Sequence, residues 1–172
     1  MDSVIVLAMH GAPPRDFPSA ELHEFFGLHA RHEASGGQTP PAMAERYHDL
    51  EARLRDWPRT EGNDPFWAGS MALAEALRQA SGHPVEVGFN EFCSPDVGTA
   101  MDAAIAAGAK RLMVVTPMMT HGGDHSEVDI PGAIAEARLR HPEVAFDYIW
   151  PFPLEDIAAF LVTQLERHLR EA

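Results

Sequence analysis

The chain has 172 residues, which is enough for one domain with a substantial core and too few for two domains of ordinary size. Its 45% hydrophobic and 23% charged residues are typical of a globular protein and argue against disorder. The 13 lysines and arginines against 26 aspartates and glutamates give a net charge of −13, which argues strongly against nucleic acid as a partner and favours cations.

Cysteine content and hydropathy argue against a secreted, disulfide-bonded protein and against a membrane protein. The single cysteine, Cys93, excludes an internal disulfide framework and is expected to be a small buried residue, not a metal ligand. The amino-terminal residues carry no basic stretch before their short apolar run, so we expect no signal peptide. No run approaches the roughly 18 apolar residues of a membrane span. We therefore expect a cytoplasmic protein without a membrane partner.

Short β-rich runs alternate with segments of helical periodicity along the chain. In chain order, the predicted elements are strand 4–9, a helical stretch 16–64, helix 71–80, strand 85–89, helix 96–107, strand 112–115, helix 130–139, strand 144–149 and helix 154–169. The first and third strands are almost continuously apolar, as expected for strands covered on both faces. The alternation predicts an α/β sandwich, with a four-stranded parallel sheet flanked by helices.

The stretch of about 16–64 is longer than a simple strand–helix–strand connection requires. Residues 21–32 and 42–57 have helical character and are separated by a segment rich in Gly and Pro, while residues 58–65 form a polar loop. We therefore expect a helical insertion after the first strand, over the sheet edge or the mouth of the site. The whole chain, 1–172, is then a single domain.

The final predicted helix is amphipathic. Five apolar residues share one of its faces: Ile157, Phe160, Leu161, Leu165 and Leu169.

Polar side chains follow three of the predicted strands. His10 comes directly after the first strand, Glu91 lies near the end of the second, and His121 and His125 lie in the loop after the third. Ligands of open α/β sheets bind outside the carboxyl ends of the strands, so we expect these side chains to converge. Imidazole and carboxylate donors suit Co²⁺, Ni²⁺, Fe²⁺ or Zn²⁺, and two histidines with one carboxylate leave coordination positions open for a substrate.

Each of these residues also has an ordinary structural interpretation. His10 could be a turn residue at a strand end, and Glu91 could cap the helix that begins near Pro95. One of His121 and His125 is expected to be exposed to solvent. A larger set of histidines is expected on solvated helix faces of the insertion: His23, His29, His32 and His48.

Motifs for two other classes of chemistry are absent. Neither the G-x-x-x-x-G-K-[ST] phosphate loop nor the G-x-G-x-x-G dinucleotide fingerprint occurs, so nothing supports a nucleotide cofactor. Phosphatases with a histidine nucleophile also begin with a strand and His-Gly, but they require an arginine beside the histidine, where Met9 stands here.

Several blocks of the sequence match a known family in the expected order. These blocks are His10-Gly11, Val85–Phe92 followed by Pro95, Gly108–Arg111 with Val114–Pro117, and Gly123-Asp124-His125 with Asp129-Ile130-Pro131. In these blocks, which extend over residues 4–13 and roughly 85–153, the chain resembles the sirohydrochlorin chelatases of the short cobaltochelatase type.

The resemblance implies a chelatase-like three-layer sandwich that inserts a divalent cation (Co²⁺, Ni²⁺ or Fe²⁺) into sirohydrochlorin or a related tetrapyrrole. It implies that His10 and His125 hold the metal, with Glu91 beside it as a further ligand or as the base for a pyrrole proton. His121 is a further candidate ligand or proton relay. Larger chelatases hold two such half-domains around one cleft, so a homodimer is expected; the alternative is a monomer in which the insertion covers the cleft.

Two other interpretations remain open: a non-catalytic carrier of metal or tetrapyrrole with the same fold, and a structural module whose histidines are incidental. Sirohydrochlorin carries many carboxylates, which a chain of charge −13 repels at long range. Local cations such as Arg15, Lys110 or Arg111 would have to offset this repulsion.

Overall fold

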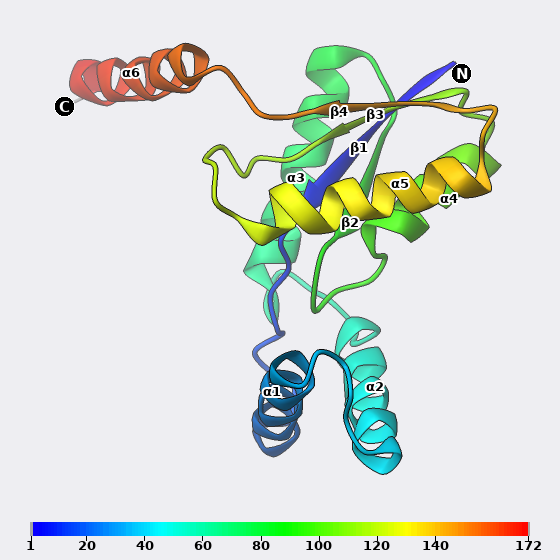
Figure 1. Cartoon of the computed structure of the whole chain (residues 1–172). Coiled ribbons are helices and arrows are strands. Elements are labelled where there is room, and N and C mark those ends of the chain that lie inside the picture. Colours follow the sequence, from blue (N-terminus) through cyan, green and yellow to red (C-terminus); the bar gives the residue numbers. More distant parts are fainter. Residues whose placement is uncertain (1, 172) are drawn as a thin grey trace.

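A four-stranded sheet, parallel throughout, forms the centre of the structure (Figure 1). The computed structural model describes residues 2–171. The strands are β1 (Ser3–Met9), β2 (Val85–Phe89), β3 (Arg111–Val115) and β4 (Ala145–Ile149), and they lie in the order β2-β1-β3-β4. The predicted α/β fold with a four-stranded parallel sheet is confirmed.

β1 lies at the centre because its residues are apolar on both faces. Val6 and Ala8 are fully buried against α4 (Val97–Ala106) and α5 (Ile130–Arg140), which cover one face of the sheet. On the opposite face, Leu7 and Met9 pack with β2 residues against α3 (Pro65–Ser81). Figure 1 shows the resulting three layers, with α3 on one side of the sheet and α4 and α5 on the other.

The predicted insertion is a hairpin of two helices, α1 (Ser19–Ala34) and α2 (Pro41–Arg55), which stands apart from the sheet (Figure 1). It has a core of its own, made of Phe17, Phe25, Tyr47, Leu50 and Leu54. His29 and His32 are half-buried against Tyr47, so the expectation of solvated helix faces is wrong for these two histidines. His23 and His48 are exposed, as expected.

α3 begins at Pro65, six residues before the predicted start at residue 71. The Asp64 side chain accepts a hydrogen bond from the backbone N–H of Trp67 at 2.9 Å, and Pro65 occupies the first helical position, where its missing N–H costs nothing. The apolar spacing is clear only from residue 73 onward, which explains the late prediction. The helix ends at Ser81, one residue after the predicted end, and Gly82, whose φ is 71°, caps it.

The last helix, α6 (Leu154–Glu171), has the predicted extent, but none of its residues is buried. In Figure 1 it projects from the sheet beyond the end of β4. Among residues 2–171, no helix combines the length and the hydropathy that a bilayer crossing requires.

Candidate metal site

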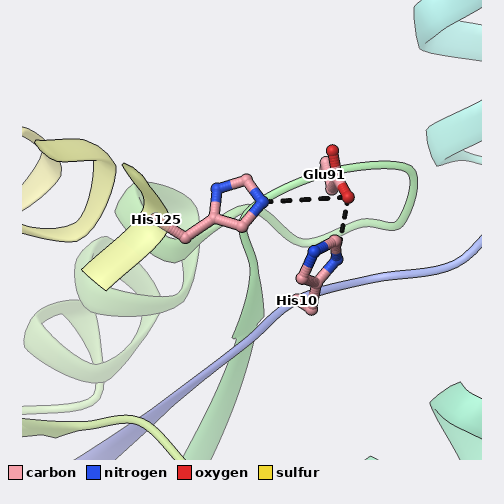
Figure 2. A group of neighbouring side chains, drawn as sticks. All are labelled: His10, Glu91 and His125. Atoms are coloured by element: carbon pink, nitrogen blue, oxygen red, sulfur yellow. Dashed lines mark ion pairs between the residues drawn. The ribbon is translucent and has the colours of Figure 1, made fainter. Parts of the chain in front are cut away.

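His10, Glu91 and His125 come together beyond the carboxyl ends of the strands (Figure 2). One ligand atom from each side chain lies within 4.8 Å of those from the other two. Nδ1 of His10 is 2.7 Å from Oε1 of Glu91, and Nε2 of His125 is 3.8 Å from the same oxygen. The two imidazole rings meet edge to face, with centroids 4.6 Å apart. Three of the four residues predicted from the strand ends are therefore neighbours.

Backbone contacts hold Glu91 beside His10. The loop after β2 is fastened to the end of β1, because the Asn90 backbone N–H donates to the Met9 carbonyl at 2.9 Å and the Glu91 N–H donates to the His10 carbonyl at 3.2 Å. Gly11 makes this approach possible, since a Cβ at that position would lie 1.8 Å from the Glu91 carbonyl oxygen and its φ is 130°.

A buried guanidinium ties the same two loops to the insertion. Arg59 donates hydrogen bonds to the carbonyl oxygens of Ala12 and Leu54, both at 2.7 Å, and to that of Phe92. It also pairs with Asp64 at 2.6 Å, and the two side chains are only 5% and 2% exposed. Ala12 lies two residues after His10, and Phe92 follows Glu91 directly. Arg59 therefore anchors both loops that carry the site.

Glu91 is not the cap of the helix that follows it. Asp96 fills that role in α4, because its side chain accepts from the Thr99 backbone N–H at 2.6 Å. Glu91 is thus free to face the histidines. Cys93 is buried, as predicted, with 1% of its surface exposed, and burial raises the pKa of its thiol, which keeps it protonated.

Asp129 orients His125. Its carboxylate lies 2.5 Å from Nδ1 of His125, four residues earlier, across the single π-helical turn η1 (His125–Asp129) that leads into α5. A carboxylate at Nδ1 favours the neutral tautomer with its proton on that nitrogen, and Nε2, 3.8 Å from Glu91, is then the nitrogen that can bind a metal ion, as in carboxylate–histidine–metal sites. No role is predicted for Asp129 from the sequence, although its four-residue spacing from His125 is the signal that could have revealed it.

His121 lies away from the other three residues. Its Nδ1 is 3.2 Å from Oε1 of Glu127, and its ring packs edge-on against Trp150 with centroids 4.9 Å apart. The backbone N–H of Gly122 and the His121 ring lower the pKa of Glu127, so this carboxylate stays ionised and competes for His121. His121 is the exposed histidine of the pair, and its role as a ligand or relay stays a prediction.

Two of the cations considered for the substrate lie at the wrong edge of the sheet. Lys110 and Arg111 stand at the amino end of β3, whereas the site lies at the carboxyl ends of the strands, and Arg111 pairs with Asp147 at 2.5 Å. The suggestion that they offset the charge of a polycarboxylate at the site is therefore wrong. Arg15, in the loop after β1, is exposed on the same side of the sheet as His10.

Comparison with known proteins identifies the family. The sequence model of the CbiX family matches residues 65–168. The chain belongs to the CbiX family. The match includes Glu91, His125 and Asp129, whereas His10 and the insertion lie outside it. The family model therefore says nothing about His10, whose place beside Glu91 and His125 comes from the structure.

Curated relatives of this CbiX chain carry chelatase names. The sirohydrochlorin cobaltochelatase of Priestia megaterium is 37% identical over 83 residues, which are 48% of this chain and 27% of that protein. The sirohydrochlorin cobaltochelatase of Methanocaldococcus jannaschii is 40% identical over 62 residues, 36% of this chain and 43% of that protein. The matched part of this chain thus covers less than half the length of either relative.

A solved structure shares the fold over the full length. The crystal structure of a CbiX protein from Marinobacter aquaeolei superposes with a TM-score of 0.51 and 17% identity, covering 99% of each chain. SirB from Bacillus subtilis, solved with Fe³⁺, has a TM-score of 0.50 and 20% identity, covering 88% of this chain and 40% of that chain. At these identities the likeness concerns the fold.

Replacement of Arg59 by Met should lower the free energy of unfolding by about 3–5 kcal/mol, because Asp64 would remain as an unpaired buried charge. Chemical denaturation measures this change. Arg53→Met is the matched control: Arg53 pairs with Glu21 in the same insertion, but on the surface, and its loss should cost less than about 1 kcal/mol. Equal effects of the two substitutions would contradict the anchoring role of Arg59.

Proposed function

We propose that this CbiX chain is a metal chelatase that inserts Co²⁺, Ni²⁺ or Fe²⁺ into sirohydrochlorin or a related tetrapyrrole. The observation that carries the proposal is the convergence of His10, Glu91 and His125 at the carboxyl edge of the sheet. The names of the relatives, which specify sirohydrochlorin with cobalt and, in a second Priestia megaterium protein, iron, support the same substrates. The metal ion is a substrate of this reaction, and no nucleotide is required.

In the proposed site, His125 and His10 supply imidazole nitrogens and Glu91 supplies a carboxylate oxygen. Three protein ligands leave coordination positions of the ion open to the pyrrole nitrogens of the macrocycle. The His10 side chain is 48% exposed, so a large planar substrate can reach the ion from solvent. The net charge of −13 favours accumulation of the cation.

The chemistry requires the loss of two protons from the macrocycle. As the divalent ion leaves its protein ligands and binds the four nitrogens, two pyrrole N–H groups each lose a proton, so the charge of the macrocycle is unchanged. Glu91 and His10, 2.7 Å apart, are placed to accept a proton as the ion departs and to pass it to solvent. His121, on the exposed loop before His125, is a candidate for a later relay.

We also propose that the working unit is a homodimer in the cytoplasm. SirB is more than twice as long as the segment that it shares with this chain. Two copies of this chain would therefore together match the length of one such relative. A cleft between two carboxyl edges would shield the macrocycle from water.

The insertion assay mixes the purified full chain with sirohydrochlorin and Co²⁺, Ni²⁺ or Fe²⁺ and follows the absorption spectrum of the macrocycle. Wild-type protein should accelerate insertion over the spontaneous rate, and His125→Ala should abolish most of that acceleration because a ligand is lost. The control is His29→Ala, which removes a histidine of the insertion that is hydrogen-bonded to Tyr47. This variant should retain the acceleration.

A protein that binds Co²⁺ without accelerating insertion of any of the three ions would be a carrier, not an enzyme. Equal effects of His125→Ala and His29→Ala would show that the site is misplaced.

Asp129→Asn tests the orientation of His125. Loss of the carboxylate that fixes the ring should weaken Co²⁺ binding by about 10–100-fold, as is usual for partners of metal-ligating histidines. Isothermal titration calorimetry measures the affinity. Glu127→Gln is the control, since Glu127 pairs with His121 outside the three-residue group. If Glu127→Gln weakens binding as much as Asp129→Asn, His121 belongs to the site and the proposed ligand set is incorrect.

A further inference from the structure

Phe92, the residue directly after Glu91, has a backbone conformation that bulky residues rarely adopt. Its φ is 59°, and among residues 2–171 it is the only residue other than glycine with a positive φ. This region is unfavourable for a residue with a Cβ, because the Cβ comes too close to a carbonyl oxygen. Such strain persists only where the surrounding structure enforces it, and it gathers at functional sites.

The strained residue is the centre of a tight turn that begins at Glu91. The Cys93 backbone N–H donates to the Glu91 carbonyl at 2.7 Å, which closes a three-residue turn around Phe92. A γ-turn whose central φ is positive is the rare, strained form. The turn fixes the Glu91 carbonyl, whose oxygen would lie only 1.8 Å from a Cβ at Gly11. The conformation of Phe92 therefore sets the backbone from which the Glu91 side chain extends.

Two aromatic residues of the insertion hold the Phe92 ring. Phe26 and Phe25, both on α1, meet it edge to face, with centroids 5.9 and 6.2 Å away. Phe25 is buried in the core of the insertion, where its ring stacks on Tyr47. Aromatic pairs in edge-to-face geometry attract each other beyond the area that they bury. The Phe92 ring is therefore fastened to α1, while its backbone adjoins Glu91.

The insertion holds the rest of this loop by a different means. Arg55 donates to the carbonyl oxygens of Asn90 and Cys93, at 3.1 and 3.3 Å, and Arg59 donates to that of Phe92. Within residues 90–93, only the carbonyl of Glu91 is held by the turn and not by an arginine. The ring contacts and the turn are thus what remains to fix the peptide group between Glu91 and Phe92.

We propose that Phe92 is a positioning residue for Glu91. Its ring, held by Phe25 and Phe26, keeps the strained turn in place, and the turn presents the Glu91 carboxylate to the two histidines of the site. This role rests on the proposed function, in which Glu91 is a ligand of the ion. A ligand that is held in position beforehand binds without a further loss of conformational freedom. The insertion thereby controls metal binding through an aromatic contact to one loop of the sheet.

The test is a double-mutant cycle on the affinity of the full chain for Co²⁺ alone, measured by isothermal titration calorimetry. Phe92→Gly still permits the positive φ but removes the ring that enforces it, so affinity should fall by about tenfold. Glu91→Gln should weaken binding at least as much. In a Glu91→Gln background, Phe92→Gly should change the affinity by less than about twofold, because the ligand through which Phe92 acts is already gone.

Two comparisons separate positioning from general stability. Phe92→Tyr keeps an aromatic ring and should bind Co²⁺ as the wild-type chain does. Phe26→Ala removes one of the two rings that hold Phe92 and should weaken binding. Phe66→Ala is its matched control, because Phe26 and Phe66 are 42% and 40% exposed but Phe66 lies on α3, and this variant should leave the affinity unchanged.

Three results would overturn the positioning role. The first is an equal loss of affinity from Phe92→Gly in the wild-type and Glu91→Gln backgrounds, which would indicate general damage. The second is Co²⁺ binding by Phe92→Gly that equals that of the wild-type chain. The third is an equal effect of Phe26→Ala and Phe66→Ala. If Phe92→Gly fails to fold, the same cycle with Phe26→Ala decides, since Phe26 is partly exposed.

The cycle also distinguishes this role from the proposed function. Co²⁺ binding by Glu91→Gln that equals that of the wild-type chain would overturn the ligand set and the positioning role together. The predicted cycle in a chain that accelerates no metal insertion would support the positioning role and contradict the chelatase proposal alone.

Discussion

The parallel pairing of β1 with β2 is the constraint on which the site depends. Met9 is in register with Phe89, so the loops that follow β1 and β2 leave the sheet side by side and in the same direction. The Glu91 N–H can then donate to the His10 carbonyl, and the side chains of these residues meet at 2.7 Å. Gly11 is required at this point, because any Cβ there would collide with the Glu91 carbonyl. His125 reaches the same place from the loop after β3, the other neighbour of β1.

The helical insertion contacts the loops that carry the candidate site. Through Arg59 it supplies the buried charge that holds the loops after β1 and β2 together, and through Phe92 its own core extends to the residue beside Glu91. The segment that the family match does not cover is thus joined physically to the segment that it does cover. An insertion fastened in this way can reshape the approach to His10, Glu91 and His125 without moving the strands that position them.

The strands and three of the site residues could be predicted from the sequence. Strands covered on both faces are almost continuously apolar, and few polar side chains directly follow them. The order of the strands then places His10, Glu91 and His125 at one edge. Other features had no such signature. The role of Arg59 depends on backbone carbonyls, which every residue possesses. His121 and His125 flank the same glycines, and only the path of the loop separates them. The amphipathic pattern predicts α6 correctly, although none of the residues of this helix is buried in the structure.

The central claim, that His10, Glu91 and His125 form the metal site, is tested most directly by crystals of the full chain grown with Co²⁺ and measured at the cobalt absorption edge. We predict a strong anomalous peak about 2.0–2.2 Å from Nε2 of His125, with a nitrogen of His10 and a carboxylate oxygen of Glu91 at similar distances. A principal peak elsewhere, for example at His29 and His32 of the insertion, with none between these three residues, would contradict it.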